Sequence, residues 1–275
     1  MYSRVYVEIT NICNMHCSFC HGHSRQPKQM TEAEYAHVLQ QLKGKTQYIY
    51  HHLMGEPLTH PLLPKFLQMA RQAGFFPMLT TNGTLLERWG EALLTPHLHK
   101  INISLHSFEG DQQEAHRRYL QQVAAFAQRA NASGILISLR LWNNGCDEGR
   151  NDTALQIFRE YFPDQWTENS RGYRIRDRLF LEWGDRFTWP DQNADHGGNS
   201  VFCHGLGDHF GILSDGTVVP CCLDSDGVIA LGNIFREELS DILSTPRAKA
   251  IAEGFRRRKA TEDLCCRCGY ARRFQ

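Results

Sequence analysis

The sequence has little that would place this protein in a membrane or on nucleic acid. No apolar run reaches about 18 residues and no signal peptide opens the chain, so we expect a cytoplasmic protein without membrane association. Basic and acidic residues number 30 each, and this zero net charge is not typical of a chain that wraps nucleic acid. Low-complexity segments and long internal repeats are also missing. A length of 275 residues suffices for one large and one small domain.

Cysteine, by contrast, is abundant, with ten residues that in a cytosolic protein indicate metal binding rather than disulfides. Cys13, Cys17 and Cys20 form a CxxxCxxC loop. Three thiolates on a cubane iron-sulfur cluster leave one iron without a protein ligand. Structural zinc is the alternative, although it prefers four ligands in paired motifs. Three histidines could supply the fourth zinc ligand: His16, His21 and His23.

The loop resembles the signature of radical S-adenosylmethionine (SAM) enzymes, in which an aromatic residue precedes the last cysteine, as Phe19 does here. The resemblance implies a [4Fe-4S] cluster held by the three thiolates, with its fourth iron chelated by the amino and carboxylate groups of SAM. It also implies a flavodoxin or ferredoxin-type reductant. Reduction of the cluster would then cleave SAM to methionine and a 5'-deoxyadenosyl radical, which abstracts a hydrogen atom from the substrate.

A second motif, Met54 to Pro57, follows a predicted strand at the family's distance from the cysteines. It resembles the GGE motif, whose backbone groups and carboxylate hold the SAM amino group. The first glycine of that motif is Met54 here, while Gly55 and Glu56 are in place. An ordinary strand-to-helix turn is the alternative interpretation.

Strand and helix patterns alternate along the first two thirds of the chain. Strands are predicted at 5–10, 47–53, 77–81, 100–105, 135–141 and 179–183. Helices are predicted at 31–42, 62–73, 85–94, 112–132 and 153–161. The first helix opens on a capping-box pattern formed by Thr31 and Glu34. Six such repeats predict an α/β fold, with a parallel sheet curled into a partial (β/α)6 TIM-like barrel over residues 1–195.

In barrels of this kind the active site lies at the C-terminal ends of the strands. Polar residues at or beyond the predicted strand ends are Thr81, Asn82, Ser104, His106, Arg140, Asn143 and Glu182. For each of them a solvated loop residue is the alternative. Ser104 resembles the residue that binds the SAM ribose, and Arg140 could bind the SAM carboxylate or an anionic substrate. The residues predicted to contact SAM are Phe19, Gly55, Glu56, Asn82, Ser104 and Arg140.

A second cysteine pattern occupies the C-terminal region. Twelve residues separate Cys203 from Gly216, four separate Gly216 from Cys221, and 43 separate Cys221 from Cys265, with Cys268 three positions later. This pattern resembles the twitch domain, the short form of the SPASM auxiliary-cluster domain. We therefore expect a small α+β domain over residues 196–275, with a hairpin at 211–220 and helices at 239–243 and 247–256. The implied ligands of an auxiliary [4Fe-4S] cluster are Cys203, Cys221, Cys265 and Cys268.

Two of these ligands have an adjacent cysteine that could replace them: Cys222 next to Cys221, and Cys266 next to Cys265. Neighbouring side chains point to opposite faces of a strand, so one of each pair should face a given iron, and the domain's spacings favour Cys221 and Cys265. Six cysteines here are too few for two fully ligated cubanes. Zinc on four thiolates is the rival interpretation of this second site. Cys146 stands alone and is expected to be an incidental thiol.

The sequence predicts a reaction type but no particular substrate. A fully ligated auxiliary cluster is suited to moving electrons, which favours a two-electron oxidation, and the compact size resembles that of twitch-bearing dehydrogenases of aminocyclitol alcohols. A peptide-modifying maturase uses the same architecture, so a small molecule or a peptide could be the substrate. An epimerase or mutase, with Cys146 or Cys222 returning a hydrogen atom, and a non-catalytic iron-sulfur electron carrier are further alternatives.

Two details of the mechanism also stay open at this stage. Oxidation needs a general base, for which the candidates are Glu182, Asp185 and His106. The aromatic segment 183–190 could cap the barrel mouth, or it could pack the barrel against the cluster domain.

Overall fold

We describe a computed structural model of the chain, which covers residues 1–95, 97–109 and 113–274. Its fold is α/β, as predicted, and is organised around one sheet with strand order β11-β10-β9-β1-β2-β3-β4-β5-β8-β7-β6. The six predicted barrel strands are present as neighbouring parallel strands. They are β1 (Arg4–Val7), β2 (Tyr48–Tyr50), β3 (Phe76–Thr81), β4 (Lys100–Ser104), β5 (Leu136–Leu141) and β8 (Leu179–Trp183).

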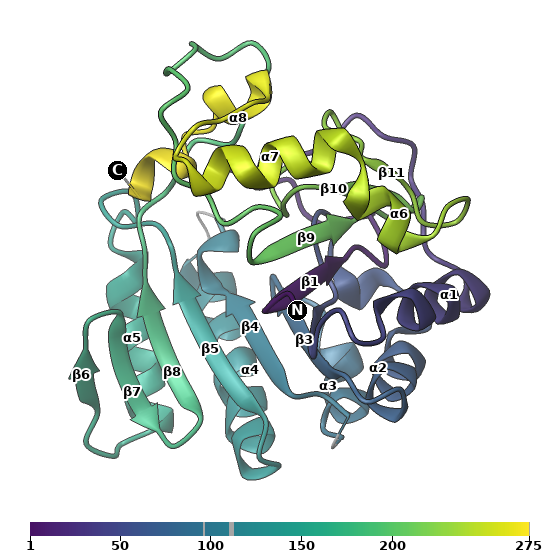
Figure 1. Cartoon of the computed structure of the whole chain (residues 1–275). Coiled ribbons are helices and arrows are strands. Elements are labelled where there is room, and N and C mark those ends of the chain that lie inside the picture. Colours follow the sequence, from purple (N-terminus) through teal and green to yellow (C-terminus); the bar gives the residue numbers. More distant parts are fainter. Residues whose placement is uncertain (96, 110–112, 275) are drawn as a thin grey trace.

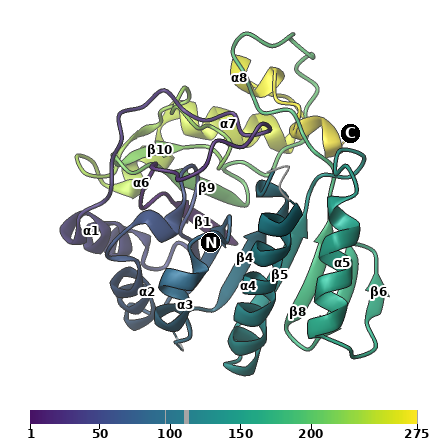
Figure 2. The same cartoon turned by 180° about the vertical axis from the view of Figure 1, so that it is seen from behind.

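Helices cover the outer face of this curved sheet (Figure 1). They are α1 (Glu32–Leu42), α2 (Leu63–Gln72), α3 (Leu86–Leu93), α4 (Gln113–Ala132) and α5 (Arg150–Tyr161). Figure 2 shows α2 to α5 on this face from behind. The capping box of α1 is confirmed, since Thr31 and Glu34 bond each other's backbone. The predicted first residue of α4, Gln112, lies outside the described residues.

Side-chain alternation decides which strand residues form the core and which face the interior of the barrel. In β1, Val5 and Val7 are buried in the core, while Arg4 and Tyr6 line a cavity on the other face. The same alternation in β4, β5 and β8 sends isoleucine and leucine to the helices and polar residues inward. The interior of the barrel is therefore built from polar and aromatic side chains.

One edge of the sheet carries a hairpin that the sequence patterns do not predict. β6 (Thr167–Asn169) and β7 (Gly172–Arg176) lie between α5 and β8 and pair antiparallel with the barrel sheet. Gly172 has φ 141°, and a Cβ there would lie 2.2 Å from the Leu181 carbonyl oxygen. Only glycine allows the hairpin to approach β8 so closely.

The C-terminal region continues the same sheet from its other edge. β9 (His209–Ile212) pairs parallel with β1 and forms the predicted hairpin with β10 (Thr217–Val219), which pairs in turn with β11 (Gly232–Asn233). Three helices lie above the strand ends in Figure 1: α6 (Leu239–Ser244), α7 (Pro246–Arg256) and α8 (Asp263–Cys266). Short 3-10 helices are η1 (Pro57–Thr59), η2 (Leu105–Ser107) and η3 (Ala271–Phe274). Within the described part of the chain, no helix combines the length and apolar character needed to cross a membrane.

Candidate active site

A cavity of about 730 Å³ lies at the C-terminal ends of the barrel strands. Its walls come from the barrel strands and the loops that follow them, the β6–β7 turn, segment 183–190 and the C-terminal region. Of the residues predicted from the sequence, those that line it are Phe19, Ser104, His106, Arg140, Glu182, Cys203, Cys221, Cys265 and Cys268. Residues from both predicted cofactor sites therefore open into one space.

The first cysteine loop follows β1. Cys13 and Cys20 are exposed, and the half-buried Cys17 has its Sγ 3.5 Å from the Ser107 carbonyl oxygen. Burial raises the pKa of Cys17 to about 11, with further contributions from Cys20, Glu109 and Cys13. Cys13 and Cys20 are thus near enough to Cys17 to oppose its ionisation, and a bound iron-sulfur cluster would reverse that effect by binding the thiolate. This donor set fits a three-cysteine cluster.

Contacts made by Glu109, Arg186 and Trp189 hold this loop against the barrel. The Glu109 carboxylate accepts hydrogen bonds from the backbone N and the Oγ of Ser18, both at 2.5 Å. Arg186 lies 3.4 Å from Glu109 and stacks over the Phe19 ring at 5.5 Å. The indole of Trp189 donates to the Phe19 carbonyl oxygen at 3.0 Å. Segment 183–190 therefore fixes the position of the loop.

The same segment reaches the C-terminal region, where the Phe187 ring meets Tyr270 edge-on at 4.9 Å. Phe187, Trp189 and Pro190 also line the cavity. Both interpretations made from the sequence therefore have a structural counterpart: the segment covers part of the cavity and packs the two regions together.

The Gly55 turn brings the motif at Met54 to Pro57 against the cysteine loop. Gly55 has φ 74°, and a Cβ at this position would lie 2.5 Å from the Thr10 carbonyl oxygen. The next amide, that of Glu56, donates to the Ile12 carbonyl oxygen at 2.9 Å. Only glycine permits this backbone contact at a positive φ.

Glu56 itself is buried and makes its contacts within the protein. Its carboxylate accepts hydrogen bonds from Thr81 Oγ1 at 2.7 Å, Asn82 N at 2.7 Å and Leu58 N at 3.0 Å. Burial raises the pKa of Glu56 to about 7, although the three hydrogen bonds act to lower it. Asn82 Nδ2 in turn donates to Asn14 Oδ1 in the cysteine loop at 3.0 Å. Glu56 and Asn82 thus connect the strand ends to the cysteine loop.

Three polar side chains stand side by side across β4, β5 and β8, because Ser104 is in register with Arg140 and Arg140 with Glu182. Arg140 Nε lies 3.8 Å from Glu182 Oε2, and its guanidinium stacks over Trp142 at 4.6 Å. Burial lowers the pKa of Arg140, while Glu182 opposes that shift. Ser138 Oγ donates to the same Glu182 oxygen at 2.5 Å.

The remaining predicted residues differ in their surroundings. Burial lowers the pKa of His106 to about 4, so its imidazole is neutral near pH 7, and its Nδ1 accepts from Trp142 N at 3.3 Å. Asp185 is exposed outside the cavity lining and accepts from Asn144 at 3.0 Å. Asn143 is buried in reciprocal amide hydrogen bonds with Asn151, both 3.1 Å long.

The four C-terminal cysteines of the predicted ligand set are neighbours. Burial raises the pKa of Cys265, and the nearby Cys203 and Cys268 add to this shift. The pKa of Cys221 is also raised by burial, with further contributions from Cys222, Cys203 and Cys265. Gly205 N donates to Cys203 Sγ at 3.4 Å. In the described parts of the chain, no three metal-binding side chains converge closely enough to hold a single ion. A cubane does not require such convergence, since each thiolate binds a different iron.

The two cysteines left open by the sequence have other neighbours. Cys266 is buried, and this burial raises its pKa. Asp263 adds to the rise, whereas Arg267 opposes it. Cys222 lines the cavity and is hydrogen-bonded to the Tyr6 hydroxyl. Cys146 is exposed in the loop after β5.

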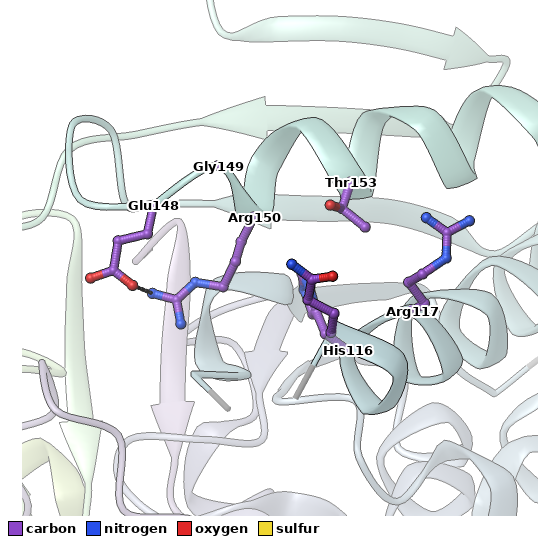
Figure 3. A pocket seen from close by; sticks show the side chains of 7 residues that line it. His116, Arg117, Glu148, Gly149, Arg150 and Thr153 are labelled. Atoms are coloured by element: carbon purple, nitrogen blue, oxygen red, sulfur yellow. Dashed lines mark ion pairs between the residues drawn. The ribbon is translucent and has the colours of Figure 1, made fainter. Parts of the chain in front are cut away.

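A smaller cavity of about 290 Å³ lies between the N-terminal ends of α4 and α5. Figure 3 shows His116 and Arg117 on one side of it and Thr153 on the other, with the Glu148–Arg150 ion pair at its edge. Its lining shares no residue with the larger cavity.

Comparison with known proteins agrees with this geometry. The profile of the radical SAM superfamily matches residues 7–142, and that of an iron-sulfur cluster-binding domain, SPASM, matches residues 203–269. The chain belongs to the radical SAM superfamily. As a radical SAM enzyme it uses a [4Fe-4S] cluster and SAM, and its SPASM domain binds an auxiliary iron-sulfur cluster.

Solved structures of similar fold are radical SAM proteins with low sequence identity. BtrN in complex with AdoMet and 2-DOIA superposes with a TM-score of 0.61 at 17% identity, covering 98% of this chain and 93% of BtrN. Native anSMEcpe with bound AdoMet gives 0.62 at 15% identity, covering 96% and 88%. SuiB of Streptococcus suis gives 0.61 at 14% identity, covering 92% and 68%. These similarities concern the fold.

Curated relatives match a shorter stretch of the radical SAM chain. The GTP 3',8-cyclase of Chlorobaculum tepidum is 29% identical over 109 residues, which cover 38% of this chain and 33% of that protein. The probable GTP 3',8-cyclase of Pyrobaculum aerophilum is 31% identical over 102 residues, covering 36% and 33%. The chain thus matches about a third of the length of these relatives.

Sequence reasoning missed several residues that organise the site. Glu8 is fully buried and binds Arg25, and Arg4 and Tyr6 line the cavity. The alternation that places Val5 and Val7 in the core puts these residues on the inner face, so a signal for them was present in the strand pattern. Their partners, 17 to 206 positions away, follow only from the fold.

Proposed function

We propose that this radical SAM enzyme carries out a two-electron oxidation, a dehydrogenation, of its substrate. Cys13, Cys17 and Cys20 would hold the cluster that binds SAM. The ligands of the auxiliary [4Fe-4S] cluster would be Cys203, Cys221, Cys265 and Cys268. When bound, these groups supply a 5'-deoxyadenosyl radical that removes a substrate hydrogen atom and an acceptor for the second electron.

The observation that carries this proposal is the shared cavity. Phe19 and Ser104 open into it from the barrel side, and Cys221 and Cys265 open into it from the C-terminal side. A substrate bound between these walls is exposed to hydrogen abstraction on one side and to electron removal on the other. Four cysteines on the far side occupy all protein positions of a cubane, which suits electron transfer rather than substrate chelation.

We further propose that SAM is held at the strand ends. The backbone at Gly55 would bind its amino group, while Glu56 and Asn82, whose side chains are engaged with Thr81 and Asn14, hold that turn and the cysteine loop in place. Ser104 is the proposed ribose contact. Arg140 is the proposed partner of the SAM carboxylate, because its guanidinium is stacked on Trp142 and fixed beside Ser104.

The oxidation also releases a proton, for which Glu182 is the proposed base. Its carboxylate lines the cavity and is oriented by Ser138 and Arg140. Asp185 lies outside the cavity lining, and the low pKa of His106, caused by burial, makes that imidazole a weak base at neutral pH.

The test is anaerobic turnover of the reconstituted enzyme with dithionite and SAM. We expect 5'-deoxyadenosine from the native sequence and none from the C13A/C17A/C20A variant. A C221A/C265A variant should still form 5'-deoxyadenosine but should give no oxidised product. With a candidate substrate, an oxidation gives a product about two mass units lighter by the loss of two hydrogens. An unchanged mass, as in a redox-neutral cyclisation, would overturn the proposal.

A peptide substrate is the second candidate, because the similar fold of anSMEcpe occurs in a structure with bound AdoMet and Cp18Cys peptide, and that of SuiB in a structure with its precursor peptide SuiA. We also retain as proposals a flavodoxin or ferredoxin-type reductant, a cytoplasmic location, and a boundary near residue 195 between the barrel and the auxiliary domain.

A further inference from the structure

The cavity described above is rich in arginine. Its lining contains five arginines: Arg4, Arg140, Arg171, Arg186 and Arg273. Its only carboxylates among the described residues are those of Glu182 and Asp224. The Asp224 carboxylate accepts two backbone hydrogen bonds, from Val228 N and Ile229 N at 2.8 Å each, and burial raises its pKa. Arg4, Arg140 and Arg186 are ion-paired with Asp208, Glu182 and Glu109, whereas Arg171 and Arg273 form no ion pair among the described residues.

Arg4 is partly buried, whereas Arg171 and Arg273 are exposed. Asp208 Oδ2 receives a hydrogen bond from Arg4 Nη2 at 2.7 Å, which fixes the orientation of the guanidinium. Arg4 Nε is buried without a hydrogen-bond partner among the described residues. Next to Arg4 on the inner face, the rings of Tyr6 and Tyr50 stack at 5.2 Å. Arg4 is therefore held rigidly in a wall built of polar and aromatic groups.

Two further arginines stand at the edge of the cavity. Arg171 is exposed in the turn between β6 and β7, and Arg273 is exposed with its guanidinium 5.4 Å from the Tyr270 ring. Burial and Cys222 raise the pKa of Tyr270, while Arg273 and Arg4 act in the opposite direction. Arg4, Arg273 and Tyr270 line the same cavity as the auxiliary cysteines.

From these observations we propose that the substrate is an anion that carries a carboxylate or phosphate group, bound by Arg4 and drawn in by Arg171 and Arg273. This inference rests on the proposed function. A fixed guanidinium binds either group in a bidentate manner, and exposed arginines around a cavity raise the local concentration of anions. Arg140 is the proposed partner of the SAM carboxylate, and Arg186 contacts the cysteine loop through Phe19, so neither is assigned to the substrate.

A competing explanation is that the arginines serve only to balance the negative charge of the cluster thiolates. The two explanations differ in what an added anion does. If the arginines form a substrate site, small anions bind saturably and compete for Arg4 and Arg171. If they serve only the clusters, their replacement changes iron content and leaves anion binding unaltered.

The experiment uses the anaerobically reconstituted holoenzyme with four probes: inorganic phosphate, pyrophosphate, malonate and succinate. Calorimetric titration and the shift in melting temperature report binding. We expect saturable binding that is weakened by salt, and at least about tenfold weaker binding in Arg171→Gln and Arg4→Gln. The exposed Arg236→Gln serves as the matched control and should bind as the native sequence does. Arg171→Gln keeps the test valid should Arg4→Gln fail to fold without its Asp208 pair.

Tighter binding of phosphate or pyrophosphate assigns a phosphorylated substrate, and tighter binding of malonate or succinate assigns a carboxylic acid. Absence of saturable binding, or equal binding by the native, Arg4→Gln and Arg171→Gln proteins, overturns the inference. Formation of 5'-deoxyadenosine by the native protein is measured in the same preparations. Its absence counts against the proposed function, and its presence without anion binding counts against the anionic substrate alone.

Discussion

The carboxylate of Glu8 and the guanidinium of Arg25 form a two-pronged ion pair, with N–O distances of 2.8 and 2.7 Å. Glu8 follows β1 and is fully buried, and Arg25 lies just after the cysteine loop. The same carboxylate accepts hydrogen bonds from Met54 N at 3.1 Å and from Ser214 N and Oγ at 3.1 and 2.9 Å. One side chain thus joins the cysteine loop, the Gly55 turn and the C-terminal hairpin.

We expect Glu8→Gln to lower the free energy of unfolding by about 3–5 kcal/mol, because it leaves Arg25, whose side chain is only 12% exposed, without its counter-charge. Glu32→Gln is the matched control, since the Glu32–Lys65 pair is half exposed on the surface and should contribute at most about 1 kcal/mol. Urea unfolding of the metal-free proteins measures both. Equal losses in the two variants would contradict a central role for Glu8.

Gly55 provides a second prediction about the same junction. Gly55→Ala places a Cβ 2.5 Å from a backbone oxygen at φ 74°, so the turn must move away from the cysteine loop. Gly44 has almost the same φ, 72°, with nothing within 4 Å of its Cβ position. Gly44→Ala should cost about 1–2 kcal/mol from backbone strain alone. Gly55→Ala should cost more and should also reduce iron incorporation, measured by iron analysis after reconstitution. Similar losses in both variants, with normal iron content, would argue against this role.

The buried His51 predicts how stability depends on pH. Its Nε2 lies 2.5 Å from the Tyr35 hydroxyl, and burial lowers its pKa to about 4. In the unfolded chain its pKa returns to about 6.5. The unfolded state therefore binds the proton first as pH falls, so this contribution to stability is complete above pH 6.5 and is lost between pH 6.5 and 4, by up to about 1.4 kcal/mol per pH unit. Urea unfolding of the native protein and His51→Gln across this range isolates the effect. Parallel curves would contradict it.

The sequence was informative where local patterns determine structure. Alternation in segments such as Ile101 to Ser104 predicted the barrel strands, and cysteine spacing predicted both groups of thiols. The hairpin β6–β7 was missed because Thr167–Asn169 is entirely exposed and has no apolar alternation. The pairs Glu8–Ser214 and Arg4–Asp208 join residues more than 200 positions apart, and only the fold brings them together.

The choice between neighbouring cysteines is of the same kind, since spacing alone left it open. The pKa of Cys265 is shifted by Cys203 and Cys268, whereas the pKa of Cys266 is shifted by Asp263 and Arg267. Cys266 is also buried, so its replacement tests packing as well as ligation.

We therefore expect Cys265→Ala to reduce the iron content of the reconstituted protein from about eight to about four per chain, because a cubane with a missing thiolate is lost more readily. Cys266→Ala should keep about eight, although it should lower the free energy of unfolding slightly by removing a small buried side chain. Iron and sulfide analysis of both variants, together with the C13A/C17A/C20A protein, checks the assignment. If Cys266→Ala loses the iron and Cys265→Ala retains it, the ligand is Cys266, and α8 must rotate in the loaded protein to turn that thiol towards Cys203.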